Sequence, residues 1–305
     1  MRKLIGFFMV LGMMLAVSQN CFAEVTVGGA LEFDYSYTEP EEGGSISDFS
    51  VSTLDLNVDA VLNEAFTTTV VLTLGDANGI DLDEGYITVK DPSKSPLYLI
   101  MGRHFLPFGQ YYTHTISDSF TDTAECDITD TGATLGAMFP DMLNLNVSVT
   151  GFRSDRLEDE ESLNGVIGRV DICPMEGIAV GGGYLTDDVE DRINVFLEVI
   201  QGPFTVDGEM FMVTDTDLDE EEMMFSIGLA FQYEKTEFAV RYGSKTDTPV
   251  ADDDGNVVDF QDQYDAVLGI NYALYDNVTL MSEYRFVDMD DAEESILGFR
   301  CAVVF

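Results

Sequence analysis

Residues 294–305 read Glu-Ser-Ile-Leu-Gly-Phe-Arg-Cys-Ala-Val-Val-Phe, with apolar residues at every second position. In a strand, one face would carry the whole apolar series: Leu297, Phe299, Cys301, Val303 and Phe305. An apolar face that continues to the last residue favours a lipid-facing strand of a closed barrel, because an exposed apolar edge in water aggregates. The alternative is an ordinary strand of a soluble β-sandwich.

The same alternation recurs along the chain and divides it into about 16 strands. Short connections rich in Pro, Gly, Asn and Asp, such as 201–203, alternate with longer ones, such as 39–47 and 245–262. We therefore expect an all-β fold, a transmembrane antiparallel β-barrel with short periplasmic turns and long acidic outer loops.

The first residues predict export. Arg2 and Lys3 precede the apolar stretch 4–17, and Cys21-Phe22-Ala23 fits a cleavage site with small residues. We expect a signal peptide over residues 1–23, cleaved near Ala23, and a barrel over residues 24–305. The expected location is the outer membrane of a Gram-negative bacterium.

The charge is strongly negative, with 57 acidic and 14 basic residues and a formal net charge of −43. Nucleic acid is excluded as a partner on electrostatic grounds. The acids gather in the long connections, which indicates a solvated surface or Ca²⁺ or Mg²⁺ bridges to lipopolysaccharide. Asp252, Asp254 and Asn256 resemble part of a calcium loop without its distal Glu, and a turn at a loop tip is the simpler interpretation. A halophilic habitat is another source of such acidity. No other cofactor is expected.

Cysteines and histidines give little support for covalent or metal chemistry. Cys126, Cys173 and Cys301 would remain after cleavage, and an odd number argues against a disulfide framework. Cys173 is expected in a periplasmic turn and Cys301 on the lipid-facing side. His104 and His114 are the two histidines of the chain.

Strand parity directs a set of basic side chains to the lumen: Arg169, Arg241, Arg285 and Arg300. One interpretation is a ladder of cross-strand ion pairs that stiffens the wall. The other is a basic strip that lines the pore, faces an acidic constriction and sets the preference for permeant ions. The net acidity predicts a preference for cations or the exclusion of small anions.

The longest connection, residues 102–130, is the candidate constriction loop. It begins without charge runs and is rich in aromatic and small polar residues, which favours a position inside the lumen over an exposed outer loop. The residues expected to act there are Arg103, His104, Pro107, Phe108, Gly109, His114, Asp118 and Asp122.

A family resemblance rests on this connection. Gly102-Arg103, Pro107-Phe108-Gly109 and Ile116-Ser117-Asp118 resemble the corresponding segment of the legiobactin-uptake type siderophore porins and, more distantly, phosphate-selective porins. The resemblance covers about 20 residues and implies passage of a solute, including a ferric siderophore. The chain departs from the first group in having no N-terminal coiled coil. It departs from the second in having few lysines.

A terminal Phe on an alternating strand also resembles the assembly signal of outer-membrane barrels, so Phe305 implies the barrel-assembly machinery as a partner. Outer-membrane lipid, lipopolysaccharide and a small solute are the other expected partners, and a homotrimer is left open.

The expected function is an outer-membrane porin for small hydrophilic solutes. The alternative is a structural or surface-binding barrel with contacts to divalent cations and lipopolysaccharide. An enzyme is not expected: His114 with Ser117 or Ser119 would only imitate a phospholipase, and the chain has no Gly-x-Ser-x-Gly elbow.

Overall fold

The computed structural model describes residues 24–40, 43–75, 79–110, 114–121, 128–153, 163–187, 190–215, 220–251, 257–289 and 292–305. Among these residues, no helix is long and apolar enough to cross a membrane. The expected signal peptide lies outside the described residues.

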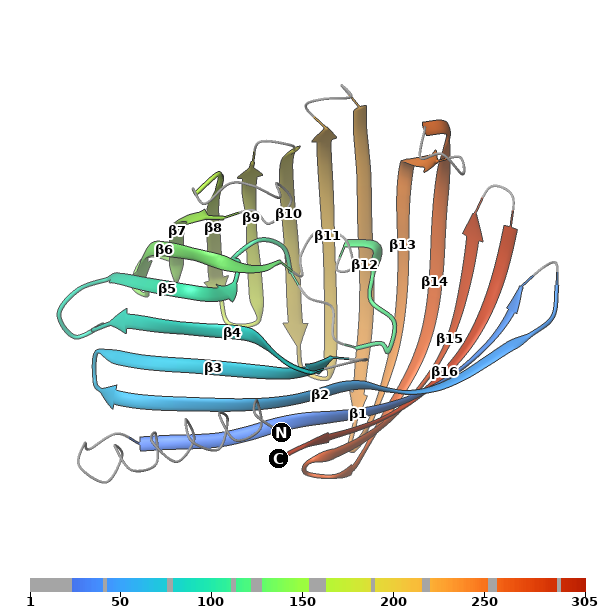
Figure 1. Ribbon diagram of the computed structural model, residues 1–305, viewed down its shortest axis with the longest axis horizontal. Coiled ribbons are helices and arrows are strands. Elements are labelled where there is room, and N and C mark those ends of the chain that lie inside the picture. Colours follow the sequence, from blue (N-terminus) through green and yellow to red (C-terminus); the bar gives the residue numbers. More distant parts are fainter. Residues whose placement is uncertain are drawn as a thin grey trace.

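The described residues form 16 antiparallel strands in one closed barrel, as the alternation predicts (Figure 1). The strands are β1 (Glu24–Pro40), β2 (Ile46–Asn63), β3 (Phe66–Gly75), β4 (Gly79–Lys90), β5 (Leu97–Phe105), β6 (Thr129–Phe139), β7 (Leu145–Phe152), β8 (Gly165–Met175), β9 (Ile178–Thr186), β10 (Glu190–Gln201), β11 (Phe204–Asp215), β12 (Glu220–Tyr233), β13 (Thr236–Ala251), β14 (Val257–Tyr275), β15 (Val278–Met289) and β16 (Ala292–Val304).

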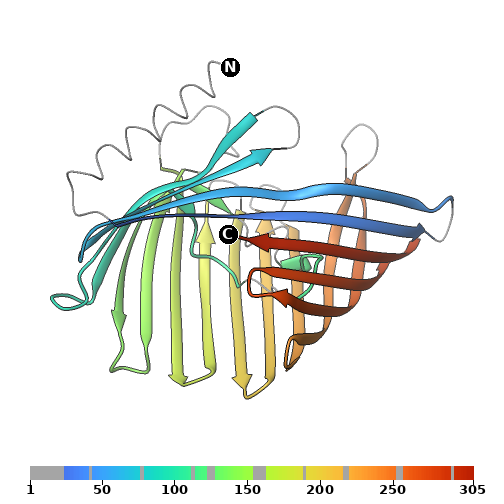
Figure 2. The ribbon, with the colours of Figure 1, turned by 90° about the horizontal axis from the view of Figure 1, so that it is seen from below.

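The barrel closes between its first and last strands, which lie side by side in Figure 2, blue against red. The pairing runs from Ala30 opposite Val304 to Pro40 opposite Glu294. Phe305 extends it, because its N–H donates to the carbonyl of Gly29 at 3.0 Å and its carbonyl accepts from the N–H of Gly29 at 2.8 Å. Closure leaves no unpaired edge, so a membrane-embedded wall satisfies its own backbone groups.

Strand β10 shows clearly the two environments of a barrel strand, the outer surface and the lumen side. Ile193, Val195 and Leu197 are exposed on the outer surface of the barrel, whereas Arg192 and Asn194 between them are buried on the inner side. An outer apolar face that alternates with an inner polar face is typical of a barrel in lipid. Most exposed apolar residues of the other strands follow such a parity, with exceptions at strand ends such as Val61 beside Leu62, which is consistent with lipid covering the middle of the outer face.

Several expected boundaries are wrong because the strands extend further toward the outer end. The connection expected at 245–262 is mostly strand, since β13 reaches Ala251 and β14 begins at Val257. Acidic residues therefore lie on strand ends as well as in loops. Cys173, expected in a turn, lies inside β8, and both Cys173 and Cys301 are free and half-buried. Cys126 lies outside the described residues.

Candidate functional site

The connection between β5 and β6 enters the barrel (Figure 1). It is shorter than expected: the loop comprises residues 106–128, because β5 ends at Phe105 and β6 begins at Thr129. Arg103 and His104 thus belong to β5 and are not loop residues. Buried His104 contacts the hydroxyl of Thr134 on β6 through Nε2 at 3.0 Å, so its ring joins two strands at the start of the loop.

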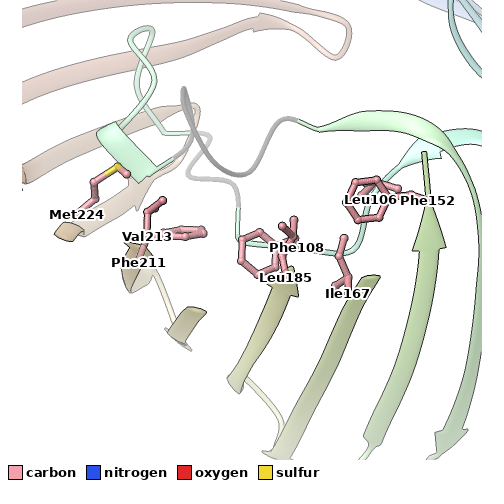
Figure 3. Close-up of a cluster of buried hydrophobic side chains, with 8 residues drawn as sticks. All are labelled: Leu106, Phe108, Phe152, Ile167, Leu185, Phe211, Val213 and Met224. Carbon is pink, nitrogen blue, oxygen red and sulfur yellow. The ribbon is translucent and has the colours of Figure 1, made fainter. Parts of the chain in front are cut away.

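An apolar cluster holds the first part of the loop against the inner face of β7–β12 (Figure 3). Its buried members are Leu106, Phe108, Phe152, Ile167, Leu185, Phe211, Val213 and Met224. Only the first two belong to the loop, and the others point inward from the wall. Burying such side chains stabilises by about 1.5–3 kcal/mol each relative to exposure, so this contact fixes the loop more firmly than any single hydrogen bond.

Two residues of the Pro107-Phe108-Gly109 triplet, Phe108 and Gly109, have identifiable structural roles. Phe108 packs edge-on against Phe211 with ring centroids 5.5 Å apart. Gly109 has a φ of +81°, a conformation that a side chain would strain. The turn presents the Gly109 carbonyl to Nη1 of Arg169 at 2.7 Å. The triplet therefore marks the point where the apolar contacts that hold the loop, the apolar anchor, end and the hydrogen bonds that hold it, the polar anchor, begin.

Arg241, on β13, is the centre of the polar anchor. Its Nη1 donates to the Thr115 hydroxyl at 2.8 Å and to the Ser117 carbonyl at 2.5 Å. Its Nη2 donates to the Ser117 hydroxyl, to the Asp118 carbonyl at 2.9 Å and to Oδ2 of Asp265 at 3.0 Å. The side chains of Arg241 and Asp265 are both 0% exposed, so the ion pair is sealed beneath the loop.

Further carboxylates bind the loop backbone directly. Oε2 of Glu283, on β15, accepts from the N–H groups of Ile116 and Ser117 at 2.7 and 3.0 Å. Oε1 of Glu209, on β11, accepts from the N–H of Gln110 at 2.8 Å. Buried backbone groups need such partners, so these acids replace the hydrogen bonds that a regular strand would supply.

Among the described residues that hold the loop, His114 is a titratable group whose charge changes near neutral pH. Its Nδ1 lies 3.0 Å from Oε1 of Glu237 on β13. Asn271, on β14, donates to both the His114 carbonyl at 3.0 Å and Glu237 at 2.9 Å. The hydrogen bond to Glu237 raises the pKa of His114 above its usual range, with Asp207 and Glu198 as further acids acting on the same ring.

A raised pKa makes this anchor pH-dependent. The stabilisation by protonated His114 is complete below the ordinary His pKa of about 6.5 and is lost as the pH rises through the higher folded value. We expect loop-related current noise in single-channel recordings of the native protein to grow as the pH rises from below about 6.5 into the alkaline range. His114→Gln should show high noise throughout that range. Constant noise in the native protein across the range would contradict this expectation.

The four arginines expected to line the pore all point inward, but they form contacts along one side of the barrel. Arg169 pairs with Asp171 at 2.8 Å, and Arg285 pairs with Asp265 at 3.0 Å. Arg300 pairs with Glu32 at 3.1 Å and Asp34 at 2.7 Å. The prediction of an open basic strip that faces the loop across the lumen is therefore wrong. Arg169 and Arg241 bind the loop itself, and Arg241 lines no open space. The arrangement is closer to the other prediction, a ladder of cross-strand ion pairs that stiffens the wall.

Among the residues that the structure describes, the opposite side of the barrel, β1–β4, differs from the side that holds the loop. Among the side chains that the structure describes on β1–β4, none is buried, whereas each of β5–β15 contains at least one buried residue. Among the described residues, hydrogen bonds join the loop to β8, β11, β13, β14 and β15, and the apolar cluster adds contacts with β7, β9 and β12. The inner face of β1–β4 is therefore the candidate lining of a path through the barrel, and we call this face the open wall.

The open wall is acidic and hydroxyl-rich. Thr73 donates to Asp55 at 2.7 Å, Thr69 donates to Asp59 at 2.6 Å, and Thr53 donates to Glu32 at 3.0 Å. Each pair joins adjacent strands. A hydroxyl donor occupies one lone pair of a carboxylate and leaves its negative charge intact. Lys90, at the end of β4, is the only basic residue in the sequences of β1–β4.

Some expected site residues are not placed. Asp122, Asp252, Asp254 and Asn256 lie outside the described residues, so neither the distal part of the loop nor the calcium-like turn is located. Across the described part of the chain, no group of three or more His, Cys, Asp or Glu residues could hold a metal ion. Asp118 contributes its backbone carbonyl to the Arg241 contact.

Comparisons with known proteins agree with this architecture. The family model described as Gram-negative porin matches residues 10–292. No individually curated protein matches the chain.

Solved outer-membrane proteins share the fold at low sequence identity. An anion-selective porin from Comamonas acidovorans is 11% identical with a TM-score of 0.70, over 93% of this chain and 100% of that chain. OmpT of Vibrio cholerae, solved in a trimer form, is 13% identical with a TM-score of 0.69, over 93% and 99%. OmpF of Salmonella typhi, in complex with daunomycin, is 13% identical with a TM-score of 0.66, over 92% and 97%.

Proposed function

Because the chain belongs to the Gram-negative porin family, a family of outer-membrane channels, we propose that it carries small hydrophilic solutes with a preference for cations. The observation that carries this proposal is the acidic open wall opposite the loop. Asp55 and Asp59 line the same face of β2 and accept hydrogen bonds from the hydroxyls of Thr73 and Thr69, and Arg103 on β5 lines the same pocket as Asp55. A strip of one sign of charge along a narrow aqueous path concentrates ions of the opposite sign.

The proposed preference is opposite to that of the structurally similar Comamonas porin, which is described as anion-selective. The loop-side arginines offer no compensating positive strip. Arg241 is covered, Arg169 and Arg285 are paired with carboxylates, and Arg300 pairs with Glu32 and Asp34 of the open wall itself. The charges of these arginines are therefore largely neutralised locally, and the acids of β2, Asp55 and Asp59, carry the proposed field.

Replacing Asp55 and Asp59 together with asparagine is expected to weaken the cation preference strongly. A unit charge about 4 Å from an ion in water contributes about 1 kcal/mol, or about fivefold in local ion concentration. The ratio of cation to anion permeability should fall by about that factor. Reversal potentials in a potassium chloride gradient across a planar bilayer measure it.

A matched control removes two acids from periplasmic turns, Glu234→Gln with Asp276→Asn, both of which are exposed. This control should keep the native reversal potential. An unchanged reversal potential in the Asp55 and Asp59 variant would exclude the open wall as the source of selectivity. A native protein that never opens in the bilayer would reject the channel proposal itself.

Two finer expectations stay proposals. Uptake of a ferric siderophore rests on the resemblance of residues 102–118, and normal iron uptake by a deletion strain under iron starvation would reject it. We propose assembly as a homotrimer because OmpT from Vibrio cholerae was solved in a trimer form. The family model is one of porins, so we do not propose the phospholipase alternative.

A further inference from the structure

A polar pocket lies at the outer end of the open wall. Its volume is about 390 Å³, which falls within the usual range for sites that bind small molecules. The lining comes from β2, β3, β4 and β5, which follow one another in the barrel. Thr73 and Asp81 of this lining stand on either side of the connection between β3 and β4, at the end opposite the short turns. We call this site the mouth pocket, because a solute that arrives from outside meets it early.

Three irregularities of the backbone meet at the mouth pocket. Ser52 is an extra residue of β2 opposite β1, and Asp83 is an extra residue of β4 opposite β3, so each forms a β-bulge. Gly102, on β5, has a φ of +129°, a conformation that side chains rarely adopt. Bulges redirect side chains and are common next to active sites. The wall is therefore specially shaped at this place and does not continue as a regular ladder.

Arg103 is turned into the mouth pocket from the lipid-facing side of the alternation. It follows two residues after Met101, which is 43% exposed on the outer surface, so a regular strand would direct both side chains outward. The positive φ of Gly102 breaks the alternation between them. The Nε of Arg103 donates to the Asp83 carbonyl at 2.9 Å. The guanidinium thus lines the pocket together with the inward-facing Asp55.

Carboxylates and hydroxyls complete the polar lining. Asp55, Asp81 and Asp83 supply the carboxylates, and Ser52, Thr53 and Thr73 supply the hydroxyls. The Thr73 hydroxyl donates to Asp55, which leaves the negative charge of that carboxylate in place. In the described part of the chain, no three such acids converge closely enough to hold a metal ion. The pocket therefore presents one guanidinium and separated carboxylates, which suits a ligand with several charged groups and not a single ion.

We propose that the mouth pocket binds a dibasic amino acid on its way into the pore. The carboxylate of the solute meets Arg103, since guanidinium and carboxylate groups form paired hydrogen bonds. The two cationic groups of the solute meet the aspartates. A plain diamine would place an ammonium group beside Arg103, and an uncharged sugar would leave the carboxylates unmatched. This proposal rests on the proposed function and names a class of solute for it.

The test measures binding to the full-length protein in detergent micelles by saturation-transfer NMR, which detects weak ligands whether or not the channel conducts. Lysine is the probe, and three analogues of similar length each lack one of its charges. Cadaverine lacks the carboxylate, ε-aminocaproate lacks the α-ammonium group and norleucine lacks the ε-ammonium group. Lysine should bind saturably, and each analogue should bind about fivefold more weakly, as expected for the loss of one charge contact.

Two variants assign the contacts. Arg103→Gln should weaken lysine binding by about fivefold and abolish the advantage of lysine over cadaverine, because only lysine has the carboxylate. Asp81→Asn should weaken the binding of both ligands. Arg153→Gln is the matched control, since Arg153 is exposed directly after the outer end of β7 and does not line the pocket, and it should bind lysine like the native protein. Retained heat-modifiable migration shows that each barrel is folded.

Several results would overturn the proposal. They are the absence of saturable lysine binding to the native protein, equal affinity for lysine and cadaverine, and unchanged lysine affinity in both variants. Reversal potentials in a potassium chloride gradient separate this outcome from a failure of the proposed function. A cation-preferring channel that does not bind lysine would overturn the mouth pocket alone. Lysine binding that follows the predicted order, in a channel without cation preference, would support the pocket and reject the proposed preference.

Discussion

Replacing Arg241 with alanine is expected to release the middle of the constriction loop and to make the channel larger and noisier. The substitution removes five hydrogen bonds, four to Thr115, Ser117 and Asp118 and one to Asp265. Breaking a buried ion pair costs about 3–5 kcal/mol. We expect a value near the lower end, because Arg285 still pairs with Asp265 after the change.

Single-channel conductance and current noise in planar bilayers measure the opening of the loop. Arg241→Lys tests the geometry, since a lysine carries the charge but lacks the planar fork that reaches several acceptors at once, and we expect an intermediate effect. Lys245→Ala is the control, because Lys245 pairs with Glu222 at 2.7 Å near the outer end of β12 and β13. Native conductance and noise in Arg241→Ala would show that the polar anchor is dispensable.

Replacing Phe108 with alanine is expected to loosen the loop at its other anchor. The ring is fully buried among inward-facing apolar side chains and stacks edge-on with Phe211. Truncation of a buried Phe costs about 3–5 kcal/mol, which includes the cavity that it leaves. Because the strands keep their own hydrogen bonds, the loss should fall mainly on the loop. Faster proteolysis of the loop and a lower unfolding midpoint in urea measure it.

The control is Phe238→Ala, which removes an exposed ring from the lipid-facing side of β13, where lipid fills the space. That variant should keep native resistance of the loop to protease. If Phe108→Ala also kept it, the apolar cluster would not hold the loop. The two anchors lie at separate parts of the loop, so the Arg241 and Phe108 effects should add.

Sequence reasoning located the strands and their two faces because a period of two is a local property. In β10, the identities of residues 192–195 and 197 assign their side chains to lipid or lumen, whereas Phe196 is apolar and yet buried on the lumen side against Arg169. The ends of the strands were harder. Acidic residues near 245–262 favour solvent, and no local signal shows that β13 and β14 continue into that solvent as a paired ribbon.

The constriction loop was recognised, but its anchors were not. The contact between Arg241 and Ser117 joins positions 124 residues apart, and sequence separation of that size gives no pairing information. One missed signal was present: β11 and β12 carry apolar residues on both parities, as in Met210, Phe211 and Met212. Apolar residues on both faces indicate that protein covers the lumen side as well. Glu209, Glu283 and Asn271 gave no such signal, since an inward polar residue is ordinary in a barrel.

The division of the lumen into the open wall and the side that holds the loop has a consequence for how such a channel can evolve. The open wall is formed by β1–β4, one contiguous segment from Glu24 to Lys90, whereas the loop and its described anchors all come from later in the chain. Substitutions on the inner face of that segment alter the surface that solutes meet without disturbing a buried contact. We therefore expect that exchanging this one piece of coding sequence between relatives transfers the proposed ion preference, if Glu32 and Asp34, which pair with Arg300 on β16, are kept.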